Sequence, residues 1–194
     1  MQLTFEDVHG TEQVYLDCLT ILSGDDRESC LDIGCNHSPF VPRLGFKERK
    51  YIDIMQRELD HVEEQPFFEK ADALHYLRKG IRYSTIYSLD QIEHVTKAYG
   101  WEQIRLMEGH SDRQIFFTPL DPWMMTDDSD DNPESHRSLW RPENFDKTWI
   151  KIVFPVYHEL LHIGAWFFMK CKEPEQEFER IAKEIKQKTW AQPW

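Results

Sequence analysis

A short apolar run that ends in an acid and a glycine constrains the fold of this chain more than any other stretch. The run is Leu31-Asp32-Ile33-Gly34, and small or polar residues follow it over 35–39. Asp53 ends a second run of this kind, 19 residues beyond Gly34. In α/β proteins a tight glycine turn lets the backbone approach a ligand, and an acid after the next strand reaches a ribose. The two runs therefore predict a Rossmann-like nucleotide pocket.

The turn departs from the pattern GxGxxG, because Asn36 stands at the position of the second glycine. That glycine allows the backbone to come close to a pyrophosphate. We therefore expect a cofactor without phosphates at this turn, in place of a dinucleotide. An ordinary strand-to-helix turn is the alternative interpretation of Asp32 and Gly34.

Four motifs, in order along residues 29–171, resemble those of the class I methyltransferases that use S-adenosylmethionine. The sequence LDIGCNHSP at 31–39 is similar to the first motif, and Asp53 stands where the family has its ribose-binding acid. Residues 71–73 resemble the adenine-binding turn, and SLDQIEHV at 88–95 resembles the fourth motif. The resemblance implies S-adenosyl-L-methionine as the cofactor. The cofactor-binding residues that it implies are Asp32, Gly34, Cys35, Asn36, Asp53, Ile54, Asp72, Ala73, Ser88 and Leu89. For Asp72, capping of the helix that follows is nearly as good an explanation, and both roles can coexist.

The sequence gives weaker signals for the residues that would bind the methyl acceptor. His94 follows the fourth motif, and the resemblance places it at the reactive end of the cofactor, where it would serve as a base. Packing or capping at the start of a helix is the alternative for His94. The segment 119–148 joins large apolar residues to an acidic loop, which favours a lid over the acceptor or a loop pinned to the core. The candidate acceptor-binding residues are Trp123, His136, Arg137 and Trp140.

Alternating strand and helix patterns along the chain predict an α/β fold. Strands are expected over 29–34, 50–54, 67–71, 83–89, 114–118, 149–157 and 164–170, and helices over 12–22, 56–64, 92–109 and 174–188. The last two strands have a short connection, so one of them should run antiparallel. We expect a Rossmann-like three-layer sandwich around a mostly parallel seven-stranded sheet. We also expect one domain over 1–194, with an N-terminal helix at 12–22 and a lid-like insertion at 119–148.

Composition limits the expected partners. The chain has 23 basic and 35 acidic residues and a formal net charge of −12, which argues against nucleic acid, because phosphate contacts need clustered cations. No apolar run approaches the length that spans a bilayer, and the N-terminus has no basic stretch followed by an apolar one. We therefore expect a cytoplasmic protein that acts on a small-molecule acceptor and binds no membrane.

An HExxH run at 158–162 keeps a second class of function open. In zinc hydrolases both histidines lie on one helix face and bind Zn²⁺, and the glutamate acts as base. Here β-rich stretches flank the run, so we expect no metal. A zinc-dependent hydrolase remains an alternative, because Glu175, Glu177 or Glu179 could supply a third ligand. A non-catalytic Rossmann-like binding module is another, because the glycine turn is incomplete.

Overall fold

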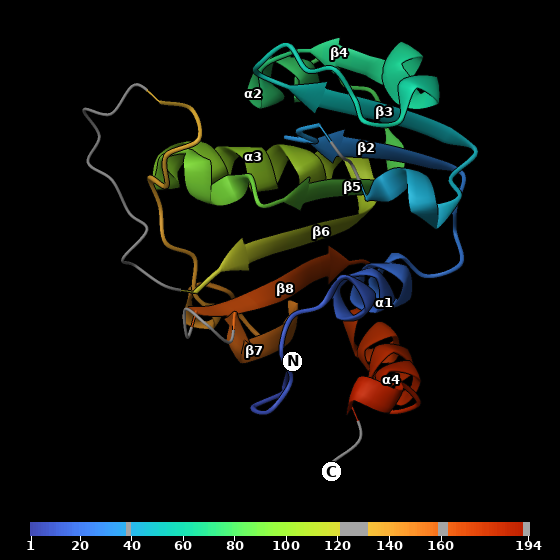
Figure 1. The fold of residues 1–194 in the computed structure, drawn as a ribbon, viewed down its shortest axis with the longest axis vertical. Coiled ribbons are helices and arrows are strands. Elements are labelled where there is room, and N and C mark those ends of the chain that lie inside the picture. Colours follow the sequence, from blue (N-terminus) through green and yellow to red (C-terminus); the bar gives the residue numbers. More distant parts are fainter. Residues whose placement is uncertain (38–39, 121–131, 159–162, 192–194) are drawn as a thin grey trace.

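The computed structural model describes residues 1–37, 40–120, 132–158 and 163–191, whose strands form one mixed sheet (Figure 1). The strand order is β1-β7-β8-β6-β5-β2-β3-β4. The strands are β1 (Gln2–Thr4), β2 (Ser29–Ile33), β3 (Glu48–Asp53), β4 (Phe68–Lys70), β5 (Tyr83–Leu89), β6 (Ser111–Pro119), β7 (Ile150–His158) and β8 (Ile163–Cys171). The predicted α/β, Rossmann-like architecture is confirmed.

The sheet is parallel except around β8, which pairs antiparallel with both β6 and β7. In Figure 1 the arrows of β2, β3, β5 and β6 accordingly point one way and that of β8 points the other. The predicted antiparallel strand near the C-terminus is therefore confirmed. The predicted number of seven strands was too low by one, because β1 adds to the edge beside β7. A strand of three residues carries too little periodicity to be seen in the sequence, and its pairing with β7 defines it.

The helices differ from the expected ones in two places. The α-helices are α1 (Glu12–Ser23), α2 (Ala73–Leu77), α3 (Lys97–His110) and α4 (Pro174–Ile185). The 3₁₀-helices are η1 (Val41–Leu44), η2 (Val62–Phe67), η3 (Ile92–His94), η5 (Pro142–Asn144) and η6 (Thr189–Ala191). The helix predicted over 56–64 is absent, and only η2 begins within that span. The helix predicted over 92–109 is divided, because Thr96 caps α3 by accepting the Tyr99 amide. None of the described helices is long and apolar enough to cross a membrane.

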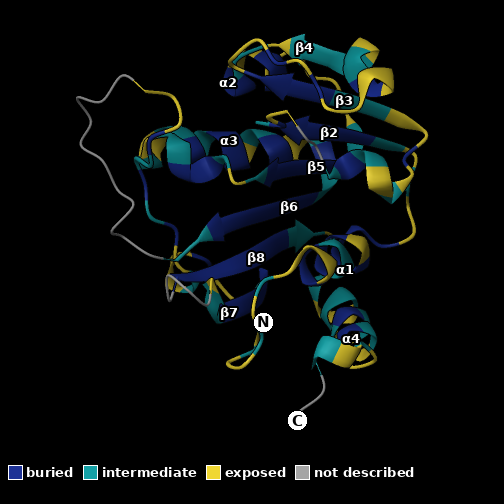
Figure 2. Ribbon diagram, in the orientation of Figure 1, coloured by how far each residue is buried: buried dark blue, intermediate teal, exposed yellow. Residues whose placement is uncertain are grey.

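Two apolar cores, one on each face of the sheet, make the fold three-layered. Successive strand residues alternate between them: Cys30 and Phe117 pack toward α1 and α4, whereas Leu31 and Phe116 pack toward α2 and α3. Figure 2 shows the central strands buried along most of their length, with exposed residues at the outer turns. The alternation follows from the period of two in a β-strand. Because helices cover both faces of the sheet, a ligand is expected at its edge, beyond the carboxyl ends of the parallel strands.

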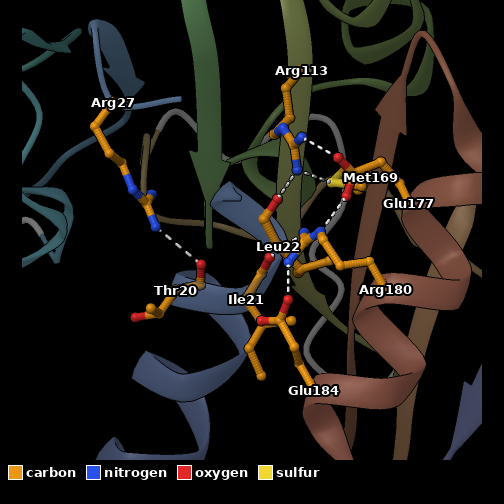
Figure 3. A network of polar contacts seen from close by, with 9 residues as sticks. All are labelled: Thr20, Ile21, Leu22, Arg27, Arg113, Met169, Glu177, Arg180 and Glu184. Atoms are coloured by element: carbon orange, nitrogen blue, oxygen red, sulfur yellow. Dashed lines mark hydrogen bonds and ion pairs between the residues drawn. The ribbon is translucent and has the colours of Figure 1, made fainter. Parts of the chain in front are cut away.

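A polar network fastens α4 to α1 and β6 (Figure 3). The guanidinium of Arg113 donates to Glu177 at 2.7 Å and to the carbonyl of Leu22. Arg180 donates to Glu177 at 2.8 Å and to the carbonyl of Ile21 at 2.7 Å. The two carbonyls belong to the last turn of α1, where the backbone amide of the C-cap residue Gly24 bonds the carbonyl of Ile21 at 3.2 Å and not that of Leu22. The network therefore satisfies a helix end while it holds α4 in place.

We expect Glu177→Gln to lower the free energy of unfolding at pH 7 by about 1 kcal/mol, within the range for partly exposed ion pairs. Partial burial acts to raise the pKa of Glu177, but hydrogen bonds from Arg113 and Arg180 outweigh it and hold the pKa below its usual value. A carboxyl with a depressed folded pKa stabilises above its unfolded pKa of about 4.3, and this stability is lost as the pH falls. Urea titrations of both proteins from pH 7 to pH 3 should therefore converge at the acid end. Glu179→Gln, an exposed neighbour on α4, is the control; a constant difference across pH would contradict the assignment.

Candidate active site

The glycine turn after β2 takes the tight form that a close approach requires. Gly34 has a φ of +73° and Asn36 a φ of +52°. The amides of Gly34 and Cys35 donate to the carbonyl of Ile52 at 2.8 and 3.2 Å, which ties the turn to β3. A Cβ atom on Gly34 would lie 2.3 Å from Cγ of Gln91. The position therefore requires glycine, for its φ and for its lack of a side chain.

The carboxylate of Asp53 organises the loop beyond β3. Its Oδ1 accepts the amide of Met55 at 2.8 Å, and its Oδ2 accepts the amide of Asn36 at 3.2 Å. Nε of Arg57 lies 3.4 Å from the same Oδ2, and Arg57 also pairs with Glu134. No motif in the sequence pointed to Arg57. A carboxylate offers about four acceptor positions, so Asp53 keeps capacity for the hydroxyl groups of a ligand.

Asp72 has the capping role that was one of its two interpretations. Its Oδ1 accepts the amide of His75 at 2.8 Å, at the start of α2. The hydroxyl of Tyr99, a residue without a signal in the sequence, donates to Oδ2 at 2.6 Å. Asp72 and Tyr99 also line the cavity described next, so capping does not remove Asp72 from the site.

A cavity of about 470 Å³ lies at the carboxyl ends of the parallel strands. The predicted cofactor-binding residues that line it are Gly34, Asn36, Asp53, Ile54, Asp72 and Ala73. Asp32, Cys35 and Leu89 line a smaller cavity of about 290 Å³, which shares Gly34, Asn36 and Asp90 with the first. Ser88 is fully buried, and its hydroxyl donates to Gln91 at 2.7 Å. It supports the cavity wall through Gln91 and lies on neither wall.

A second cavity, of about 500 Å³, adjoins the first. Four of its lining side chains are aromatic, namely Tyr15, Phe40, Phe117 and Tyr157. Asp90 and His94 line both cavities. Of the two other predicted polar residues on this side, His136 lines the second cavity and Arg137 the first. The structure therefore brings His94 and His136 to the junction of the two spaces.

Several acids at the strand ends are held in poorly solvated positions. Burial, and then the nearby carboxylate of Asp53, raises the pKa of Asp32 to about 8. Asp90 is accessible from the cavities, yet the surrounding protein desolvates it and raises its pKa to about 7. Burial, and then Asp90, raises the pKa of Glu93 well above its usual value. Desolvation lowers the pKa of His94, which favours its neutral imidazole.

Glu93, His94 and His136 form a compact group of possible metal ligands. One nitrogen or oxygen atom from each lies within 4.8 Å of the others. The imidazole rings of His94 and His136 meet edge to face, with centroids 4.8 Å apart. Glu93 lies inside the fourth motif, but it was assigned no function from the sequence, because no metal site was expected. Its meeting with His136 depends on the tertiary structure.

The described part of the predicted lid-like insertion is pinned beside this group. The backbone amides of Arg137 and Ser138 donate to the carbonyl of Glu93 at 2.7 and 3.0 Å. The indole of Trp140 donates to the carbonyl of Ile92 at 3.1 Å. Trp140 was expected to contact the acceptor. It is instead fully buried in the core, because its indole packs against apolar residues next to η3. Trp140 therefore supports the cavity wall from the core side and does not line the cavity. Trp123, the fourth candidate, lies outside the described residues.

The HExxH run is described only at its first residue. His158 is the last residue of β7 and pairs with Ile163 of β8. A zinc-protease site would need this histidine on a helix. Residues 159–162, including the second histidine, lie outside the described residues.

Comparisons with known proteins identify the fold. No family model and no curated protein matches the chain. Among solved structures, the chain is similar to the N-methyltransferase NodS from Bradyrhizobium japonicum WM9, with a TM-score of 0.58, 12% identity and coverage of 83% of this chain and 96% of that chain. It is also similar to magnesium protoporphyrin IX methyltransferase (ChlM) from Synechocystis PCC 6803 with bound SAM, with a TM-score of 0.53, 12% identity and coverage of 81% and 79%. The chain has the class I methyltransferase fold.

A third methyltransferase of this fold is much longer than the chain. The small RNA methyltransferase HEN1 matches with a TM-score of 0.57 and 14% identity over 82% of this chain. That match spans only 25% of the HEN1 chain. Since the sequences are this far apart, the likeness establishes the methyltransferase fold, and the chemistry has to be argued from the site.

Proposed function

We propose that this protein is an S-adenosylmethionine-dependent methyltransferase that acts on a small-molecule acceptor. The observation that carries the proposal is the pair of cavities that meet at Asp90 and His94, one lined by the predicted donor-binding residues and the other by aromatic rings. Methyl transfer is an in-line displacement, so it needs donor and acceptor sites that open onto each other. We also propose a cytoplasmic location.

The donor cavity suits a cofactor of this kind. Its volume of about 470 Å³ falls within the usual range for small-molecule sites. The only lysine or arginine side chains among its described lining residues are Arg57 and Arg137, and Arg57 is already paired with two acids. A nucleoside without a pyrophosphate therefore fits better than a dinucleotide. We assign Asp53 to the ribose hydroxyls and the Asp72–Ala73 turn to the adenine.

S-adenosylmethionine supplies a methyl group on a sulfonium, which any well-placed nucleophile can accept. The chain's part is to align that nucleophile and to exclude water. We assign the second cavity to the acceptor, because Tyr15, Phe40, Phe117 and Tyr157 offer apolar faces for a small organic body. We place His94, which lines both cavities, next to the acceptor atom that receives the methyl group. His136 and Arg137 complete the polar side of the path.

We expect Asp53→Asn to weaken S-adenosylmethionine binding by about 1–3 kcal/mol, the range for a lost charge-assisted bond or an unsatisfied buried partner. Asparagine keeps the shape and one acceptor oxygen, so it can still accept the amide of Met55 or that of Asn36, but not both. Isothermal titration calorimetry with S-adenosylmethionine and S-adenosylhomocysteine measures the effect. Asp60→Asn, an exposed acid beyond the same loop, is the matched control. If Asp53→Asn binds both ligands as tightly as the unmodified protein does, Asp53 is not part of the site. If the unmodified protein binds neither ligand, the proposed function is refuted.

A further inference from the structure

The strongest unexplained feature of the site is the buried carboxylate of Glu93. The residue is 2% exposed, and among the described residues its Oε2 atom has no hydrogen-bond partner. The buried Nδ1 atom of His94 likewise has no partner there. Buried polar atoms are nearly always satisfied, because leaving one unpaired costs the full desolvation penalty. Two such atoms on adjacent residues therefore point to a missing ligand that bonds both.

The surroundings of the group limit what that ligand can be. Both imidazoles and the carboxylate can present lone pairs, and the neighbouring Asp90 adds a second acid that lines the same cavities. A group of acceptors with two acids attracts a cation, and imidazole with carboxylate is a typical ligand set for first-row divalent metals.

The group is also held in place. Because the amides of Arg137 and Ser138 bond the carbonyl of Glu93, the backbone fixes His136 relative to η3. The ring of His136 meets that of His94 edge to face with centroids 4.8 Å apart. Ligand atoms at the tetrahedral angle around one ion, with bonds of about 2.0–2.2 Å, lie about 3.3–3.6 Å apart. The observed atoms lie within 4.8 Å of one another, so binding needs a closure of at most about 1.5 Å by the side chains.

We propose that Glu93, His94 and His136 bind a divalent transition-metal ion at the junction of the two cavities. Three protein ligands would leave coordination positions free for the acceptor, and Asp90 lines the same cavities. There the ion would bind an oxygen of the acceptor and lower its pKa, so that the oxygen reaches the methyl group as a stronger nucleophile. This departs from the expectation of no metal, and it does not use the HExxH histidine of β7, His158, although that residue lines the same second cavity. Ion binding stands on its own, whereas its action on the acceptor rests on the proposed function.

Titration of the chelator-treated full chain with Co²⁺ alone, followed by visible absorption, tests the site, and calorimetry with Mn²⁺ repeats the test. We expect one ion per chain and at least tenfold weaker binding in Glu93→Gln, His94→Gln and His136→Gln. Two variants outside the group should bind the ions like the unmodified protein: His75→Gln, which lines neither cavity, and His158→Gln, which lines the second cavity but is not a ligand. Absence of saturable binding, or binding lost in His158→Gln and kept in the other variants, would overturn the proposal.

A second measurement requires no variant to fold. In the unmodified protein, Mn²⁺ should broaden the imidazole resonances of His94 and His136 and spare those of His75 and His110; the reverse pattern would refute the site. Calorimetry with S-adenosylmethionine in the presence of a chelator separates the two proposals. Cofactor binding without ion binding would defeat only the metal site, whereas ion binding without cofactor binding would defeat only the methyltransferase function.

Discussion

Trp140→Ala is expected to lower the free energy of unfolding by about 3–5 kcal/mol, the usual cost of truncating a buried aromatic residue. Its indole is fully buried and donates to Ser138 at 2.8 Å as well as to Ile92. The ammonium of Lys97 lies 3.8 Å from the ring centroid. A Cβ atom on Gly100 would come within 2.4 Å of the indole, so α3 is packed directly on this ring. Truncation would leave a large cavity between α3 and the wall of the site.

Urea denaturation followed by circular dichroism measures this loss. Trp101→Ala is the matched control, because Trp101 contacts Trp140 but is 40% exposed. We expect the control to cost less than half as much. Since Trp140 also supports the segment that carries His136, the folded Trp140→Ala protein should bind Co²⁺ more weakly than the Trp101→Ala protein. Equal stabilities of the two variants would show that Trp140 is not a core residue.

Gly34→Ala is expected to weaken S-adenosylmethionine binding more than tenfold and to cost about 1–3 kcal/mol of stability, the range for a strained backbone position. The new methyl group would meet Gln91, whose Oε1 is held by Ser88 at 2.7 Å and by Gln103 at 2.8 Å. Because Gln91 is anchored on two sides, the turn has to shift. The turn forms part of the donor cavity, so binding should fall together with stability.

Gly45→Ala separates backbone strain from the clash. Gly45 has a φ of +74°, close to that of Gly34, but a Cβ atom there would meet nothing within 4 Å. We expect the Gly45 variant to lose about 1–2 kcal/mol of stability, as any residue in this conformation would, and to bind S-adenosylmethionine normally. Calorimetry on both variants checks the difference. Similar binding losses in both would mean that the clash with Gln91 is unimportant.

The strands and the turn could be predicted because their signals are local. The strand over 83–89 was predicted with its observed bounds, and the turn at Gly34 follows from three adjacent residues. The missing helix over 56–64 shows the limit of local signals. The carbonyl of Gln65's side chain accepts the amide of Leu59 at 2.9 Å, and Arg57 is drawn to Asp53. These contacts hold the segment as a loop. They cannot be predicted from the spacing of charged residues, which is the signal that suggested a helix.

By itself, the sequence determined the layered α/β fold and the residues that end its parallel strands, because apolar periodicity and turn chemistry act between near neighbours. Only the tertiary structure decided which of those residues meet. Glu93 and His136 are distant in sequence, and the backbone bonds from Arg137 and Ser138 to Glu93 bring them together. The same packing buried Trp140, which the sequence had suggested for the acceptor wall, since an indole that can bond the carbonyl of Ile92 is more stable in the core than in water.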